Sequence, residues 1–169
     1  RGIVDGQAQK LNRVVTSVTD VVDCYEEYDK YAEYAKLDTL RFVVSNTTEA
    51  GITYDASDKL ENNPPNSFPG KLTKFLYERY TYFNGASDKG LVMLPVELID
   101  DNGIHLKECV LKLAALWGLE DGFIDWINNA CVFTSTLVDR IVTGYPKDEV
   151  EDIWNELGYQ DNMLVTGEP

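Results

Sequence analysis

The sequence predicts an α/β fold in which a mostly parallel sheet is flanked by helices. Short apolar runs of the buried-strand type occur at residues 40–44 and 91–94, and each is followed by a segment with helical spacing of apolar residues. Strand and helix signals therefore alternate, as is typical of parallel strands joined by helices. No repeat, low-complexity tract or linker interrupts the pattern. We therefore expect one domain or part of one.

The first part of the chain carries signals for β structure. Asp5-Gly6 is a turn sequence typical of hairpins, and valines follow at positions 14, 15, 18, 21 and 22. We expect a β-hairpin or edge strands here. Residues 24–37 then show tyrosine and alanine at spacings of three and four. This segment is predicted to be a helix whose tyrosine face packs against other parts of the protein.

The two apolar runs are expected to be separated by a helix. Residues 40–44 predict the first strand, and Ser67 is a good N-cap for a helix that reaches about residue 83. Asn84-Gly85 is a suitable end for this helix. Residues 91–94 predict the second strand, which Pro95 is expected to break.

Further helices are expected in the last part of the chain. Residues 104–117 are strongly amphipathic, and residues 123–129 resemble a second helix. The apolar face of the first of these is formed by Leu106, Val110, Leu113 and Trp117. Residues 132–142 are strand-prone but interrupted by charges, and residues 146–157 predict a last helix that ends at Gly158.

Composition excludes several classes of function. The chain of 169 residues has a net charge of −14, which opposes binding to nucleic acid and to anionic membranes. It has no apolar run of the length that spans a membrane, about 18 residues. Three cysteines without CxxC spacing and a single histidine argue against a metal site. We expect reduced, buried thiols and a cytoplasmic protein.

Polar side chains follow both predicted strands, where ligands bind in open parallel sheets. The two loops are residues 45–51 and 97–103, and Asp139-Arg140 is a third polar point in an apolar stretch. Each of these three features also has a purely structural interpretation. The 45–51 loop is then only the end of a strand, the 97–103 loop is an ordinary turn, and Asp139-Arg140 is an ion pair. His105 is expected to be a surface or capping residue in the first turn of a helix.

Several catalytic and nucleotide-binding motifs are missing from the sequence. No glycine-rich phosphate loop follows a strand, and there is neither a Walker motif nor a GxSxG elbow. With one histidine, a serine-hydrolase triad is not supported. The chain is therefore not expected to hold a nucleotide phosphate through a loop of its own.

Specific motifs nevertheless identify a family. The sequence resembles the mannitol dehydrogenase family of long-chain polyol dehydrogenases, and the match covers essentially the whole chain. The motifs that carry the resemblance are RFVV at 41–44, SNTTEAGI at 45–52, FPGKLT at 68–73, LYER at 76–79, PVELI at 95–99, Asn102-Gly103, TLVDRIVTGYP at 136–146 and LGY at 157–159.

The resemblance implies a Rossmann-like NAD-binding domain and assigns roles to several residues. The loop side chains Asn46, Thr47, Thr48 and Glu49 would lie against the nicotinamide side of NAD. Val138 and Asp139 would line the cleft towards a second, mostly helical domain. The side-chain amide of Asn102 would polarise the reacting carbonyl oxygen, because hydride transfer develops negative charge there.

The resemblance also implies that the chain is a fragment. Residues 1–169 would be the middle and later part of the N-terminal domain, without the glycine-rich loop and without the C-terminal helical domain that carries the catalytic lysine. The loop motifs are most similar to the branch of the family that interconverts tagaturonate and altronate, so a sugar-acid substrate is expected and the fragment itself is expected to be inactive. A reductase of fructuronate or fructose, or a non-catalytic α/β binding module, remains an alternative.

Overall fold

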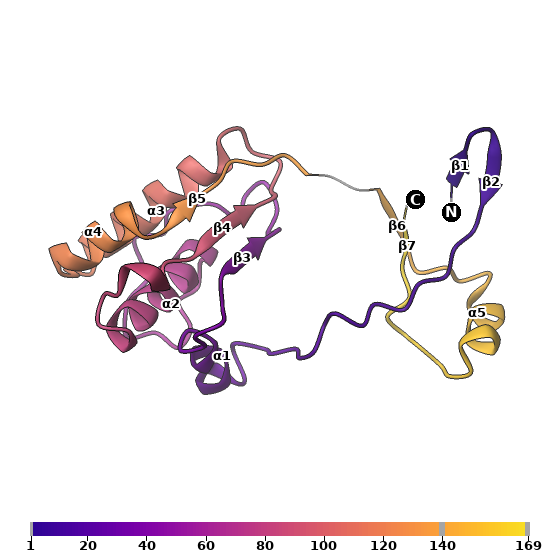
Figure 1. Cartoon of the computed structure of the whole chain (residues 1–169), viewed down its shortest axis with the longest axis horizontal. Helices are drawn as coiled ribbons and strands as arrows, with labels where there is room; N and C mark the ends of the chain where they lie inside the picture. Colours follow the sequence, from indigo (N-terminus) through magenta and orange to yellow (C-terminus); the bar gives the residue numbers. More distant parts are fainter. Residues whose placement is uncertain (1, 139–140, 168–169) are drawn as a thin grey trace. The chain divides into compact units, whose positions relative to one another are not determined.

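The structure is a computed structural model that describes residues 2–138 and 141–167 (Figure 1). The chain divides into two compact units. The larger unit is residues 21–138, and the smaller one combines the first 20 residues with those that follow residue 138. The sequence shows no linker, so this division was not predicted. No helix in the described ranges is long and apolar enough to cross a membrane.

The larger unit contains the predicted parallel sheet. Its three strands are β3 (Phe42–Ser45), β4 (Val92–Pro95) and β5 (Val132–Phe133), with β4 in the centre. Both strand pairs are parallel. The strand β4 ends at Pro95 as expected, although Pro95 is itself its last residue and pairs with Ser45. A strand can end on proline because the ladder there needs no further N–H donor from that residue.

Helices connect and cover these strands. They are α1 (Tyr28–Tyr34), α2 (Phe68–Tyr82), the short 3-10 helix η1 (Ser87–Lys89), α3 (Asn102–Leu116) and α4 (Asp121–Asn129). Ser67 caps α2 as predicted, since its hydroxyl accepts a hydrogen bond of 2.9 Å from the Gly70 N–H. The predicted helix over residues 24–37 is shorter than expected. Helix α3 packs against β4 and β5, and α2 packs against α3 and α4.

One hydrophobic core fills the larger unit. The predicted apolar face of α3 contributes to it, since Leu106 and Val110 belong to this core and Trp117 packs against it, while Leu113 is also fully buried. Aromatic side chains from α2 and α4 extend this core, and the Phe123 ring packs edge-on against Tyr80 at 5.5 Å between centroids. Burial of a side chain of this size stabilises a fold by about 1.5–3 kcal/mol. This core holds the strand ends in a fixed arrangement.

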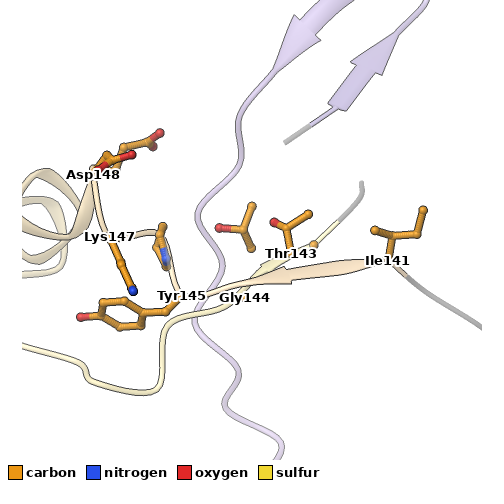
Figure 2. Close-up of a pocket in the computed structure, with 10 residues that line it drawn as sticks. Ile141, Thr143, Gly144, Tyr145, Lys147 and Asp148 are labelled. Atoms are coloured by element: carbon orange, nitrogen blue, oxygen red, sulfur yellow. The ribbon is translucent and has the colours of Figure 1, made fainter.

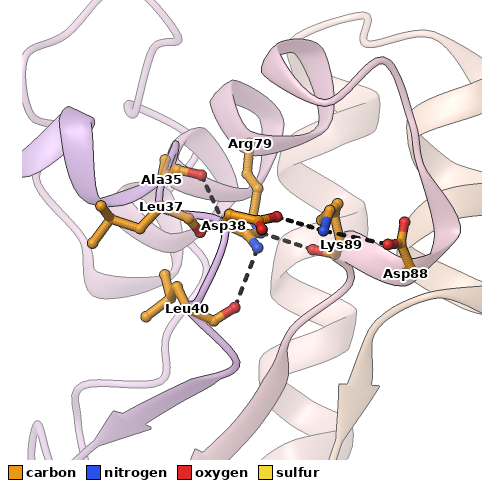
Figure 3. Close-up of polar contacts among 7 residues, drawn as sticks. All are labelled: Ala35, Leu37, Asp38, Leu40, Arg79, Asp88 and Lys89. Atoms are coloured by element: carbon orange, nitrogen blue, oxygen red, sulfur yellow. Dashed lines mark hydrogen bonds and ion pairs between the residues drawn. The ribbon is translucent and has the colours of Figure 1, made fainter.

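Arg79 on α2 joins three parts of the larger unit through hydrogen bonds (Figure 3). Its guanidinium is buried and donates to four backbone carbonyl oxygens at 2.7–3.2 Å. The acceptors are the carbonyls of Ala35, Leu37, Leu40 and Lys89. Burial lowers the pKa of Arg79, and nearby Asp38 opposes that effect. Arg79 therefore ties the segment between α1 and β3 to the segment before β4.

The smaller unit is built from short antiparallel pairs and one helix. Strands β1 (Gly2–Val4) and β2 (Gln7–Gln9) form the predicted hairpin, in which Asp5 and Gly6 both have positive φ angles, 52° and 76°. Strands β6 (Val142–Gly144) and β7 (Thr166–Gly167) pair antiparallel, and α5 (Val150–Leu157) lies between them in sequence. Gly158 ends α5 as predicted, and its φ of 79° is left-handed. The predicted strands over the valines at 14–22 are wrong, because this segment has no regular structure.

Candidate functional site at the carboxyl edge of the parallel sheet

The three parallel strands end at one edge of the sheet. Figure 1 shows the arrowheads of β3 and β4 pointing in the same direction, and the segments that leave this edge are residues 46–51, 96–101 and 134–138. This edge is where ligands bind in open α/β sheets. Both polar loops singled out from the sequence lie here.

In the loop after β3, one polar side chain faces the protein interior and three face solvent. Asn46, Thr48 and Glu49 are exposed, whereas Thr47 is half-buried and points inward. A turn closes the loop, because the Gly51 N–H donates to the Thr48 carbonyl at 3.0 Å. Thr48 has a φ of 106°, which is rarely adopted by a β-branched residue. The loop therefore holds a strained conformation that presents three polar side chains to solvent.

Glu97 is the buried carboxylate of this edge. Only 1% of its surface is exposed, and both oxygens accept hydrogen bonds. Oε1 accepts from the Thr47 N–H at 3.1 Å and from the Thr47 hydroxyl at 2.9 Å, and Oε2 accepts from the Ser45 hydroxyl at 3.1 Å. The carboxylate thus joins the loop after β4 to the end of β3 and to the loop that follows it.

The charge of Glu97 is stabilised by these donors. Burial raises the pKa of the Glu97 carboxyl, but hydrogen bonds from its own backbone N–H, from Ser45 and from Thr47 oppose burial. The pKa of Glu97 lies below its usual value as a result. A carboxylate that accepts several hydrogen bonds favours the charged form. Glu97 is therefore an acceptor and not a proton donor at neutral pH.

Asn102, the first residue of α3, is fully buried at the same edge. Its Nδ2 lies 3.1 Å from the Pro95 carbonyl, 3.0 Å from the Glu97 carbonyl and 2.6 Å from the Thr136 carbonyl, and its Oδ1 accepts from the Thr136 N–H at 3.1 Å. An amide has two N–H donors, so three carbonyls already compete for them. Asn102 joins the ends of β4 and β5 through these bonds.

Gly103 allows α3 to approach β5 closely. A Cβ at this position would lie 2.2 Å from the Thr134 carbonyl oxygen, which is a backbone atom. The Asp101 residue before the helix has a left-handed φ of 53° and no side-chain capping bond. His105 lies exposed in the first turn of α3, as predicted.

The structure thus brings together some of the residues predicted from the sequence. The 46–49 loop and Asn102 share one hydrogen-bonded network through Glu97. Val138 is exposed and lies two residues beyond Thr136, while Asp139 and Arg140 lie outside the described residues. Glu97 begins the predicted 97–103 loop and Thr136 begins one of the family motifs, but neither residue was given a role from the sequence. The one local signal for Glu97 is an acidic residue between apolar neighbours directly after a strand.

A separate open pocket of about 620 Å³ belongs to the smaller unit. Figure 2 shows Ile141, Thr143, Tyr145 and Lys147 around it. None of the described residues predicted to bind substrate or cofactor lines this pocket. The candidate site is therefore still placed at the carboxyl edge of the sheet and not in this pocket.

Thiols do not contribute to the candidate site. All three cysteines are free, Cys109 and Cys131 are buried, and Cys24 is half-buried. Burial raises the pKa of the Cys131 thiol to about 11, so this thiol is a poor nucleophile. Within the described part of the chain, no group of three or more His, Cys, Asp or Glu side chains could hold a metal ion.

Comparison with known proteins places these features in a family. The family model described as "Mannitol dehydrogenase Rossmann domain" matches residues 3–169. Altronate oxidoreductase of Bacillus subtilis is 48% identical over 99% of this chain and 35% of its own length, and that of Pectobacterium atrosepticum is 60% identical over 76% of this chain and 26% of its own length. The chain thus spans about a third or less of the length of these relatives.

Solved structures agree with the fold. Pseudomonas fluorescens mannitol 2-dehydrogenase, in a ternary complex with NAD and D-mannitol, has a TM-score of 0.72 at 20% identity and matches 92% of this chain and 33% of its own. A D-sorbitol dehydrogenase has a TM-score of 0.64 at 18% identity, over 86% of this chain and 31% of its own. The chain belongs to the mannitol dehydrogenase family, through the Rossmann domain of that family.

Proposed function

We propose that this chain is the cofactor-binding part of a longer, cytoplasmic, NAD-dependent oxidoreductase that interconverts D-tagaturonate and D-altronate. The observation that carries the proposal is the identity of 48–60% to proteins named altronate oxidoreductase. In the first of them this identity extends over 99% of the chain, including both loops of the carboxyl edge.

The exposed side chains of the loop after β3 are assigned to the nicotinamide side of NAD. Asn46, Thr48 and Glu49 offer amide, hydroxyl and carboxylate groups at the edge where such ligands bind, and Thr47 supports them from within. Val138 and Asp139 complete the set proposed to face the cofactor. Bound NAD would supply the hydride chemistry. The residues of this chain would orient the nicotinamide and exclude water.

The pyrophosphate would be held by residues outside this chain. Backbone N–H groups of a glycine-rich turn at a helix N-terminus usually bind it, and the sequence lacks such a turn after a strand. We therefore expect the 169-residue chain alone to bind NAD weakly and to show negligible reductase activity. Titration calorimetry of this chain with NAD is the direct check. Micromolar affinity would contradict the expectation.

Asn102 is proposed to act on the reacting carbonyl oxygen of the substrate. Asn102 is fully buried and its amide N–H groups already have three carbonyl partners, so contact with substrate requires the side chain to become exposed and to exchange one of these partners. Replacement by alanine in the full-length protein is expected to lower kcat more than it raises KM, because the interaction strengthens as negative charge develops. An unchanged kcat would leave Asn102 with its structural role alone.

Substrate choice is tested by an NADH oxidation assay of the full-length protein with tagaturonate, fructuronate and fructose side by side. A clear preference for tagaturonate is the expected result. Activity with only one of the other two would keep the cofactor and the reaction type but change the substrate. Inactivity with all three would contradict the proposal and favour a binding module.

A further inference from the structure

We propose that the side chain of Glu97 is a positioning residue that fixes the 46–51 loop for cofactor binding without touching the cofactor. This inference rests on the function proposed above. It adds a residue that acts through Thr47. It predicts that the binding of NADH, and not the chemical step, depends on Glu97.

Both hydrogen-bond donors of Thr47 bind the Glu97 carboxylate. The backbone N–H and the hydroxyl of Thr47 both donate to Oε1 of Glu97, at 3.1 and 2.9 Å. Glu97 is 1% exposed and both of its carboxylate oxygens accept hydrogen bonds from Ser45 and Thr47, so the carboxylate faces these residues and not a bound ligand. A buried acceptor of two donors from one loop residue fixes both the backbone and the side chain at that point.

The loop around Thr47 leaves little room for its side chain. A Cβ at Gly51 would lie 2.0 Å from the Thr47 hydroxyl oxygen, so the Thr47 side chain is held closely between Gly51 and Glu97. The neighbouring Thr48 has a φ of 106°, a conformation that persists only where its surroundings impose it. The exposed side chains of Asn46, Thr48 and Glu49 are therefore oriented by the contact between Thr47 and Glu97.

The side chain and the main chain of Glu97 contact different partners. Its side chain contacts the β3 end and loop, whereas its main-chain carbonyl accepts from Asn102 at 3.0 Å. A substitution of the side chain leaves the carbonyl in place. Changes at Glu97 should therefore alter cofactor affinity and leave the substrate side, which depends on Asn102, nearly unchanged.

Two variants of similar volume separate hydrogen bonding from packing and from charge. Glu97→Met removes every acceptor and fills the same space. Glu97→Gln keeps one oxygen for both Thr47 donors, while its amide nitrogen can donate to the Ser45 hydroxyl oxygen, which now accepts. In the full-length protein, Glu97→Met should raise the KM for NADH about tenfold or more, with little change in kcat or in the KM for tagaturonate. Glu97→Gln should remain within about threefold of wild type.

Ser45→Ala is the matched control. It removes a hydrogen bond to the same carboxylate at 3.1 Å without loosening Thr47, so the KM for NADH should change less than about twofold. Equal effects of Glu97→Met and Glu97→Gln would show that charge and not the Thr47 contact matters, which contradicts the proposal. An unchanged KM for NADH in Glu97→Met, or equal rises in both KM values, would also contradict it.

Amide hydrogen exchange of the same proteins keeps this inference distinct from the proposed function. Exchange over residues 46–51 should be faster in Glu97→Met than in wild type and restored in Glu97→Gln. If wild type reduces none of the sugars, the proposed function fails, and exchange still tests whether Glu97 holds the loop. Identical exchange in wild type and Glu97→Met would overturn the positioning role.

Discussion

The two units of the chain differ in how they bury apolar side chains. Among the described buried hydrophobic residues, Ile153 alone belongs to the smaller unit, and the others lie in the larger one. Leu76 in the larger unit is 0% exposed, whereas Leu11 in the smaller unit is 81% exposed. The strands of the smaller unit have two or three residues, and isolated strand pairs of this kind are marginally stable in water.

This difference shows what stabilises the candidate site. The carboxyl edge belongs to the larger unit, whose core fixes the ends of β3, β4 and β5. Hydrogen bonds of Glu97 and Asn102 then join these ends. A site that must orient a cofactor benefits from such rigid support. Changes to the larger unit should therefore have large effects on stability, and similar changes in the smaller unit should have small ones.

The largest effect is expected from Arg79→Met. This change leaves four backbone carbonyls without their buried donor, so it should lower the free energy of unfolding by about 3–5 kcal/mol. Urea denaturation followed by circular dichroism measures it. Arg41→Met is the control at an exposed arginine of the same unit, with an expected change within about 0.5 kcal/mol. Equal effects of the two changes would contradict the role of Arg79.

A matched pair of leucine substitutions compares the two units directly. Leu76→Ala should cost about 2–5 kcal/mol, because it opens a cavity in the core of the larger unit. Leu11→Ala should change the free energy of unfolding by less than about 0.5 kcal/mol, since most of that side chain contacts solvent. The same denaturation experiment measures both. A large cost at Leu11 would show that the smaller unit buries it in solution.

The sequence predicted the larger unit better than the smaller one. The Ser67 cap and the apolar face of α3 follow from local chemistry and from helical spacing, and the structure confirms both. The valines at 14–22 favour strands, but a strand also needs a partner, and none of the described strands includes that segment. Arg79 was missed because the carbonyls that it binds come from segments about 10–44 residues away.

The candidate site was predicted in part. The position of the 45–51 loop follows from its place after an apolar strand, and Asn102 was expected at the same edge through the family resemblance. The sequence does not show which loop side chains turn inward, because that depends on contacts between loops. Thr47 and Glu97 are 50 residues apart, and only the folded sheet brings them together.

The smallest predicted effect concerns pH. The pKa of Glu97 is lower in the folded protein than in the unfolded chain, where it is about 4.3. Its contribution to stability is therefore fully present above that value and is lost as the pH falls through the lower, folded pKa. The difference in unfolding free energy between wild type and Glu97→Gln should narrow on acidification below about pH 4. A constant difference would mean that the carboxylate is not stabilised by folding.

Amide hydrogen exchange of the full-length protein with and without NADH tests most directly whether the carboxyl edge binds the cofactor. NADH should slow exchange over residues 46–51 and leave β6 and α5 of the smaller unit nearly unchanged. Protection that is absent from residues 46–51 while NADH is bound would contradict the assignment of this edge to the nicotinamide.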